Sequence, residues 1–148
     1  ICYYFPPIVS SGVARSLEFA RLLPTFGWKP LVLTVRDSKD PWINVGRDTH
    51  PEGICVERTT EWNLAGFADF LHGCCSRVAR FLGKDLTHNL FREYLCIPDS
   101  QIAWFSTIAA RRLARGCDLI YASCSPFSSS VSAAIVKRLT GLPLVVDF

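Results

Sequence analysis

The sequence predicts a doubly wound α/β domain built on a parallel sheet. Apolar, strand-like runs alternate along the chain with segments whose apolar residues recur at helical spacing. Two Ser- and Pro-containing loops, residues 6–12 and 123–128, each join a strand to a helix. With 148 residues, 49% of them apolar and 20% charged, the chain has the size of one domain and can form a hydrophobic core. Right-handed crossovers then give the strand order 3-2-1-4-5.

The first half of the chain is predicted to form a strand–helix–strand unit followed by a third strand. Pro6 and Pro7 end the first apolar run, and Gly27 ends the helix after it. The second apolar run is nearly continuous, which is typical of a strand covered on both faces. The expected elements are a strand at residues 1–5, a helix at 13–26, a strand at 31–35, a polar loop at 36–53 and a strand at 54–58.

The second half begins with a long helical crossover and ends with another strand–helix–strand unit. Asp99 or Ser100 can cap the second crossover helix, and Ser125 with Pro126 is typical of the start of the last helix, which Gly141 ends. The expected elements are helices at 64–81 and 101–115, a strand at 118–122, a helix from 126 to 140 and a strand at 144–148. The first of these helices is expected to bury one apolar face, formed by Leu64, Phe67, Leu71, Cys74, Val78 and Phe81.

Composition and motifs exclude several classes of function. A net charge of +3 with scattered basic residues does not favour nucleic-acid binding. The cysteines and histidines lack the spacing of a metal site, and an odd number of cysteines without a glycosylation sequon indicates reduced thiols in the cytoplasm. The uncharged stretch at 119–136 contains Pro126 and many serines, so it is not expected to span a membrane. G-x-G-x-x-G, GK[ST] and G-x-S-x-G are all missing, which argues against dinucleotide, P-loop and hydrolase sites.

The two loops form the candidate binding site. In an open parallel sheet, ligands bind outside the carboxyl ends of the strands where the strand order reverses, here between the first and fourth strands. Both loops lead into helix N-termini, whose N–H groups suit a phosphate or a polyhydroxylated sugar. The serines would equally serve as helix caps and turn residues. The candidate hydroxyls are those of Ser10, Ser11, Ser123, Ser125 and Ser128.

Two stretches of the chain resemble bacterial family 4 glycosyltransferases. The first is residues 6–35, PPIVSSGVARSLEFARLLPTFGWKPLVLTV, and the second is residues 97–148. The second carries the more specific features, which are Ile97-Pro98-Asp99, Trp104, the run SCSPFS, and Gly141-Leu142-Pro143 before a strand that ends in Asp147-Phe148. The resemblance implies the GT-B fold, in which two Rossmann-like domains face each other across a cleft. This chain would be part of the N-terminal, acceptor-side domain, without the C-terminal nucleotide-sugar domain.

The resemblance also implies an activity and a set of site residues. The activity is transfer of a sugar, with retention of configuration, from a nucleotide-sugar donor to a cell-surface glycan or lipid-linked acceptor, with no cofactor and no metal. Gly12 would approach the donor diphosphate, Arg15 matches an arginine at the start of the first helix, and Asp147 ends a strand at the cleft. Val9 and Ser10 stand where family members carry two glycines, and a Val held at positive φ would cost about 1–2 kcal/mol. Catalytic residues are not assigned, because the family's Arg-Asp-Pro-Trp loop would follow the last residue of this chain.

Two alternatives stay open. A non-catalytic glycan- or partner-binding member of the same fold is favoured by the Val9-Ser10 pair. A Rossmann-type nucleotide-binding domain of an oxidoreductase or epimerase is disfavoured by the missing glycines.

Basic and aromatic residues on the crossover helices predict contact with an anionic membrane surface. Such side chains suit a protein bound peripherally at the inner face of the cell membrane. The same arginines would otherwise form an ordinary solvated helix face. The membrane-facing candidates are Arg77, Arg80, Lys84, Trp104 and Arg111.

Overall fold

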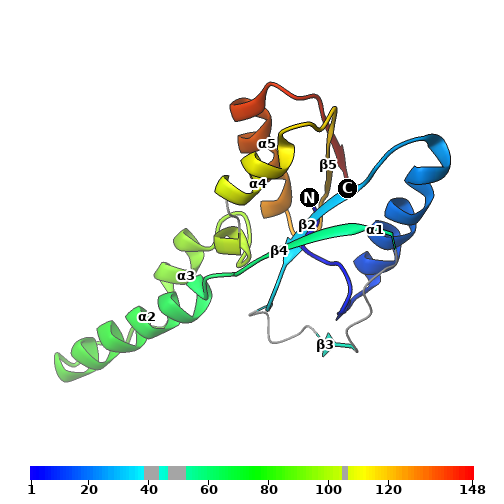
Figure 1. Ribbon diagram of the computed structural model, residues 1–148. Coiled ribbons are helices and arrows are strands. Elements are labelled where there is room, and N and C mark those ends of the chain that lie inside the picture. Colours follow the sequence, from blue (N-terminus) through cyan, green and yellow to red (C-terminus); the bar gives the residue numbers. More distant parts are fainter. Residues whose placement is uncertain (39–43, 47–52, 105–106) are drawn as a thin grey trace.

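The computed structural model describes residues 1–38, 44–46, 53–104 and 107–148 (Figure 1). Its architecture is mixed α/β, with 48% helix and 15% strand, which confirms the predicted class at that level. The helices are α1 (Ser11–Leu22), α2 (Leu64–Phe81), α3 (Leu90–Leu95), α4 (Thr107–Ala114) and α5 (Ser128–Thr140), with 3-10 helices η1 (Leu23–Phe26) and η2 (Ile102–Trp104). The body contains the strands, α1, α4 and α5, whereas α2 and α3 project from one side (Figure 1).

The strands of the described residues form three two-stranded sheets, two of them parallel. In one parallel pair Leu31 lies opposite Cys55, and in the other Ser123 lies opposite Asp147. The predicted strands at 31–35, 54–58, 118–122 and 144–148 are therefore confirmed within two residues at each end. The strands are β1 (Ile8–Val9) antiparallel to β3 (Asn44–Val45), β2 (Leu31–Val35) parallel to β4 (Cys55–Thr59), and β5 (Ile120–Ser123) parallel to β6 (Leu144–Asp147).

Residues 1–5 are not a strand in the structure, contrary to the prediction. They make isolated backbone hydrogen bonds to both parallel pairs instead of a continuous ladder. The Cys2 N–H donates to the carbonyl oxygen of Leu33 in β2 at 3.0 Å. On the other side, the Ile1 nitrogen donates to the Tyr121 carbonyl at 2.7 Å, and the Ser123 N–H donates to the Ile1 carbonyl at 3.1 Å. The N-terminal segment therefore lies between β2 and β5.

The loops differ from the prediction at two places. β1 forms within the predicted loop at 6–12, where Ile8 pairs with Val45 of β3. The predicted loop at 36–53 thus contains a strand of its own, and its residues 39–43 and 47–52 lie outside the described residues.

The body helices follow the predicted spans with shifted ends. The helix predicted at 13–26 is α1 continued by η1, and Gly27 ends it with a φ of 82°. The predicted helix at 101–115 is divided into η2 and α4, and residues 105–106 between them lie outside the described part of the chain. α5 begins at Ser128 with Phe127 at the N-cap position, two residues later than predicted, so the capping roles predicted for Ser125 and Pro126 are wrong.

The core of the body is built around two aromatic residues. Tyr3 is fully buried and meets the ring of Trp104 edge-on at a centroid distance of 5.3 Å. The buried residues that pack with them come from β1, β2, β5, α4 and α5, and they are Ile8, Leu33, Val35, Ala110, Ile120, Ala122, Ala133 and Val136.

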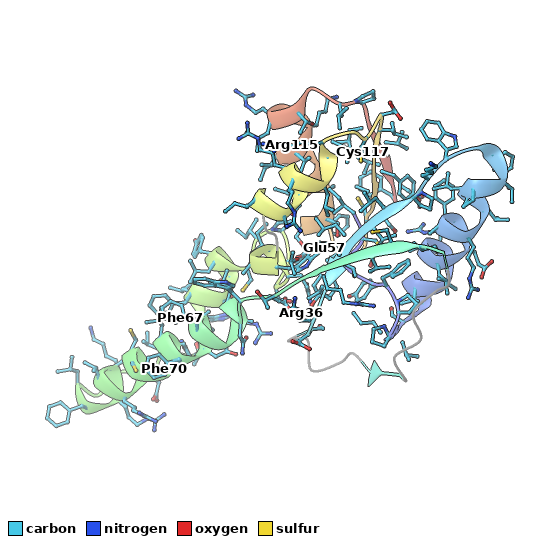
Figure 2. The ribbon with its side chains drawn as sticks, viewed as in Figure 1. Arg36, Glu57, Phe67, Phe70, Arg115 and Cys117 are labelled. Carbon is cyan, nitrogen blue, oxygen red and sulfur yellow. The ribbon has the colours of Figure 1, made fainter. Side chains whose placement is uncertain are left out.

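α2 and α3 form a helical arm with little burial. α2 has the predicted bounds, but Ala68 is its one fully buried residue, so the predicted core face of this helix is wrong. The helix packs against α3, which the sequence analysis did not predict, rather than against a sheet. Phe67 and Phe70 accordingly lie exposed on the arm (Figure 2).

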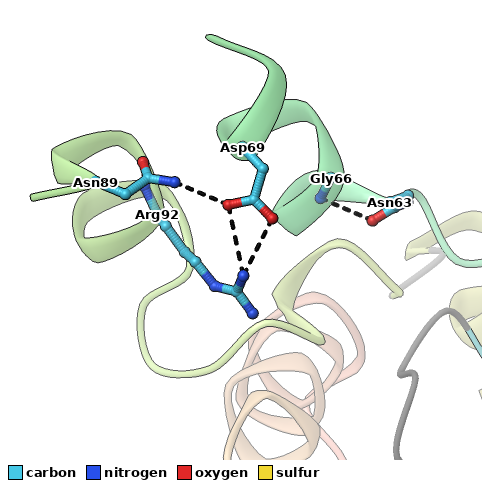
Figure 3. A network of polar contacts seen from close by, with 5 residues as sticks. All are labelled: Asn63, Gly66, Asp69, Asn89 and Arg92. Carbon is cyan, nitrogen blue, oxygen red and sulfur yellow. Dashed lines mark hydrogen bonds and ion pairs between the residues drawn. The ribbon is translucent and has the colours of Figure 1, made fainter. Parts of the chain in front are cut away.

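Polar contacts hold the arm together (Figure 3). Asp69 of α2 accepts hydrogen bonds from Asn89 Nδ2 at 2.8 Å and from Arg92 Nη1 at 3.1 Å. Asn63 and Asn89 cap the first turns of α2 and α3 through their side-chain oxygens, which accept the N–H groups of Gly66 and Arg92. Among the helices of the described residues, none is long and apolar enough to cross a membrane.

Candidate functional site

A polar cluster lies where the first turns of α1 meet the carboxyl ends of β5 and β6. We call it the Arg15–Asp147 cluster, and it comprises Arg15, Tyr121, Ser123 and Asp147. Arg15 Nε lies 3.2 Å from Asp147 Oδ2, and the Tyr121 hydroxyl donates to the same oxygen at 2.6 Å. Arg15 also donates through Nη2 to Ser123 Oγ at 3.4 Å and through Nη1 to the Phe148 carbonyl at 3.1 Å. Three residues predicted for the site are therefore in contact.

Local structure explains why these side chains converge. Ser123 and Asp147 are the last residues of β5 and β6 and lie opposite each other in the parallel register. The ring of Phe19 stacks on Tyr121 at 4.6 Å, which holds α1 against β5 and brings Arg15 over the strand ends. The cluster thus lies at the carboxyl ends of β5 and β6 beside α1, whereas the expected ligand site lay between the first and fourth strands.

The protonation state of the cluster follows from burial and hydrogen bonding. Burial raises the pKa of Tyr121 well above its ordinary value, and the hydrogen bond to Asp147 raises it further. The phenol therefore stays a donor at neutral pH. Burial also raises the pKa of the neighbouring Cys124 thiol, which argues against a thiolate nucleophile at this position.

The cluster is accessible and has no net charge. The side chains of Arg15 and Asp147 are 43% and 32% exposed, so solvent and ligands can reach both. Because the guanidinium and the carboxylate are paired with each other, the cluster offers no unpaired positive charge. Its donors and acceptors match the hydroxyl groups of a neutral sugar better than a diphosphate.

The first predicted loop contributes less than expected. Ser10 occupies the N-cap position of α1 without a side-chain cap hydrogen bond, and Ser11 is exposed. Gly12 packs beside Tyr4, whose Cδ2 would lie 3.4 Å from an added Cβ. Val9 belongs to β1, and no described residue other than glycine has a positive φ. The strain that the sequence analysis attached to Val9 is therefore not present.

The second predicted loop already holds an anion from the chain itself. Asp99 Oδ2 accepts the N–H of Ser128, the first residue of α5, at 2.8 Å, and its Oδ1 accepts the N–H of Gln101 at 3.1 Å. Asp99 was predicted as a cap for the crossover helix alone. Ser125 is exposed at the surface of this loop, whereas Ser128 is buried and its hydroxyl has no hydrogen-bond partner. Of the serines predicted here, Ser123 is the one that contacts Arg15.

A second polar centre was missed by the sequence analysis. The buried Tyr3 hydroxyl donates to Glu61 Oε2 at 2.7 Å and lies 2.7 Å from Ser38 Oγ. Glu61 is only 8% exposed, and burial raises the pKa of Tyr3. Within the described residues, four buried side-chain atoms have no hydrogen-bond partner: Thr59 Oγ1, Trp104 Nε1, Ser128 Oγ and Ser129 Oγ. A glutamate two residues after β4 gives no local pattern that would have revealed this pairing.

The predicted membrane-facing residues separate into three groups. Trp104 is 1% exposed, so its assignment to a membrane surface is wrong, because the indole is part of the core. Arg111 is exposed on α4 in the body. Arg77, Arg80 and Lys84 are exposed at the end of the arm.

Other candidate sites are weak. In the described ranges no three His, Cys, Asp or Glu side chains are grouped as metal ligands, and all seven cysteines are free thiols. A pocket of about 400 Å³ lies at the base of the arm, lined by Asn89, Arg92, Glu93, Cys96 and Ser100. Arg92 is engaged there by Asp69 (Figure 3), and none of the lining residues belongs to the Arg15–Asp147 cluster.

Comparison with known proteins found no match for the chain among protein-family models, curated proteins or solved structures.

Proposed function

We propose that the chain is the acceptor-side domain of a retaining glycosyltransferase of the GT-B kind, resembling family 4. It would act with a nucleotide-sugar domain that follows it, transferring a sugar to a glycan or lipid-linked acceptor. Nucleotide-sugar donors and free thiols suit the cytoplasm, where the enzyme would work at the inner face of the membrane. The Arg15–Asp147 cluster carries the proposal, because it joins Arg15, Ser123 and Asp147 at the sheet edge where this fold binds its substrates.

The proposal includes a doubly wound sheet of five parallel strands. The backbone bonds of Ile1 and Cys2 support it, because they put the N-terminal segment beside β5 and β2. The order would be β4, β2, residues 1–5, β5 and β6, which is 3-2-1-4-5 when the strands are numbered along the chain. The pattern in which Ile1 donates to Tyr121 and accepts from Ser123 is that of a parallel pair.

The neutral charge of the cluster supports a role in binding the acceptor sugar rather than the donor diphosphate. Asp147 would accept from a sugar hydroxyl while Arg15 and Tyr121 donate to others. Transfer with retention then needs alignment of the acceptor hydroxyl with the donor and stabilisation of the leaving diphosphate. The second task would belong to the nucleotide-sugar domain.

The experiment compares two arginines of α1 in the protein that carries this chain together with the proposed nucleotide-sugar domain. Arg15→Gln removes the partner of Asp147. Arg21→Gln is the matched control, because Arg21 makes a similar exposed ion pair with Glu18 at 2.8 Å on the same helix. Release of nucleoside diphosphate from a panel of nucleotide sugars is measured with a bacterial lipid extract as acceptor.

We expect the Arg15→Gln variant to raise the KM for the acceptor about tenfold, since one charge-assisted hydrogen bond contributes roughly 1.5 kcal/mol or more. Arg21→Gln should match the unchanged protein. Equal activity of the two variants would show that the Arg15–Asp147 cluster does not bind the acceptor. The isolated 148-residue chain should bind nucleotide sugars weakly or not at all, and a micromolar Kd by calorimetry would contradict the assignment to the acceptor side.

A second candidate is a non-catalytic, glycan-binding member of the same fold. The carboxylate of Asp99 at the start of α5 favours it, because this N-terminus would otherwise be free for a phosphate. Glycan binding by the protein without diphosphate release from any donor would support this candidate over the transferase.

A further inference from the structure

Several apolar side chains at the end of the arm are exposed to solvent. Where α2 ends, Phe81 is 91% exposed, and its neighbours Val78, Leu82 and Leu86 are also exposed. Gly83, with a φ of 72°, turns the chain back toward α3. Leaving such side chains in water forfeits the free energy that their burial would provide, and clusters of this kind mark interaction sites.

The same end of the arm is basic. Arg77, Arg80 and Lys84 are exposed within residues 76–86, and Asp85 is the acidic residue of that stretch. Of the acidic side chains further along the arm, Asp69 pairs with Arg92 at 3.1 Å, and Glu93 Oε1 lies 3.5 Å from His88 Nδ1, a contact that is an ion pair only when the imidazole is protonated. Exposed apolar and basic side chains therefore lie together at the end of the arm, in a stretch that we call the arm tip, made of Arg77, Val78, Arg80, Phe81, Leu82, Lys84 and Leu86.

We propose that the arm tip docks on an anionic lipid bilayer. Phe81, Leu82 and Val78 would enter the boundary between head groups and acyl chains, while the basic side chains contact lipid phosphates. The shape of the molecule supports this geometry, because the arm projects from the body and its tip can reach a flat surface without obstruction (Figure 1). The proposal confines the membrane contact to the arm and excludes both Trp104 and the α4 residue Arg111.

Charge favours a bilayer over a second copy of the chain. Two arm tips brought together would oppose their excess of basic side chains, which costs free energy at close range. An anionic bilayer offers the complementary charge and also accepts apolar side chains of any shape. Pairing through the arm is nevertheless a defined outcome of the test below.

The test is co-sedimentation of the 148-residue chain with vesicles of phosphatidylcholine alone and of phosphatidylcholine mixed with phosphatidylglycerol. We expect binding to the mixed vesicles that falls at high salt. The triple variant Arg77→Gln, Arg80→Gln and Lys84→Gln should weaken this binding about 100-fold, at roughly fivefold for each basic side chain. Phe81→Ala should weaken it on the order of tenfold, because the buried ring is lost.

Matched controls on the body separate docking from general attraction to the vesicle. The triple variant Arg111→Gln, Arg115→Gln and Arg138→Gln removes the same charge from exposed positions on α4, the turn after it and α5. Phe26→Ala removes an exposed ring at the end of η1. Both should bind much as the unchanged chain does, and all variants should keep its circular dichroism spectrum because the changed side chains are exposed.

Three results would overturn the proposal. Equal binding to neutral and anionic vesicles would show that lipid charge is not needed. An equal loss of vesicle binding in the arm-tip and body variants would show that the arm is not the docking site. A dimer in size-exclusion chromatography that Phe81→Ala converts to a monomer would assign the surface to a second copy. Sugar transfer is not a readout here, so failure of the transferase proposal would leave this test unaffected.

Discussion

Replacing Tyr3 by Phe removes one hydroxyl group from the centre of the body. The ring of Tyr3 is fully buried and meets Trp104 edge-on, a contact that Phe at this position should keep. What is lost is the hydrogen bond that the hydroxyl donates to Glu61 Oε2 at 2.7 Å, together with the contact to Ser38. Because Glu61 is buried, water cannot fully replace the missing donor.

The expected cost at neutral pH follows from the charge and burial of the partner. A hydrogen bond to a charged group contributes about 1.5–3 kcal/mol, so we expect the free energy of unfolding to fall by roughly 2 kcal/mol. For a chain of this length the melting temperature should fall by about 4–8 °C. Tyr94→Phe is the matched control, because Tyr94 lies exposed on the arm, and its loss of a hydroxyl should change stability very little.

The same residue predicts how stability changes in alkali. Burial and the Glu61 carboxylate raise the pKa of Tyr3 in the folded state above its ordinary value near 10. The stabilisation from this group is complete below pH 10, where the phenol is protonated in both states. Above pH 10 the unfolded chain loses a proton that the folded chain keeps, so the free energy of unfolding should fall by about 1.4 kcal/mol per pH unit from this group.

Urea unfolding at neutral pH and at several values above pH 10 measures both effects. The Tyr3→Phe variant should start lower at neutral pH and then lose stability less steeply in alkali. A neutral-pH change below about 0.5 kcal/mol, or an alkaline slope identical to that of the unchanged chain, would refute the buried Tyr3–Glu61 pairing.

Two further predictions concern Asp99 and the arm. Asp99→Ala removes the acceptor for the N–H groups of Ser128 and Gln101. The free energy of unfolding measured with urea should fall by about 1–2 kcal/mol. Asp99→Asn should lower it less, and Asp118→Ala, at an exposed position, should leave it almost unchanged. Asp69→Ala breaks exposed contacts between α2 and α3 and should change global stability by less than about 1 kcal/mol. It should nevertheless speed amide hydrogen exchange in α3 clearly more than Asp85→Ala does, because so short a helix depends on its tertiary contacts. Equal exchange in the two variants would contradict the role of Asp69 in holding α3 on α2.

Local signals predicted most of the regular structure. Continuous apolar runs located β2, β5 and β6, and helical spacing located α2 at both ends. Gly27 and Gly141 ended their helices as expected, since each adopts the positive φ that glycine tolerates. The start of α5 was wrong because its cap comes from Asp99, which lies far back in the sequence.

Burial was harder to predict than secondary structure. The apolar face of α2 has ordinary core spacing, but nothing in the spacing indicates whether a sheet lies against it. Trp104 was assigned to a surface because it is aromatic and lies near basic residues, whereas the structure uses its large ring to fill the core beside Tyr3. At the site, the positions of Arg15, Ser123 and Asp147 were predicted, but their mutual pairing and the role of Tyr121 depend on three-dimensional contacts.

The pairing of Arg15 with Asp147 makes the carboxylate a tethered competitor for the guanidinium. A group attached to the same fold acts at an effective concentration of millimolar or more, whereas a free anion must compete from bulk solution. Small anions in the medium should therefore compete poorly for the Arg15 guanidinium, which should stay paired with Asp147 in their presence. A ligand that binds Arg15 must also donate a hydrogen bond to Asp147. The site therefore favours molecules that carry a hydrogen-bond acceptor and a donor next to each other.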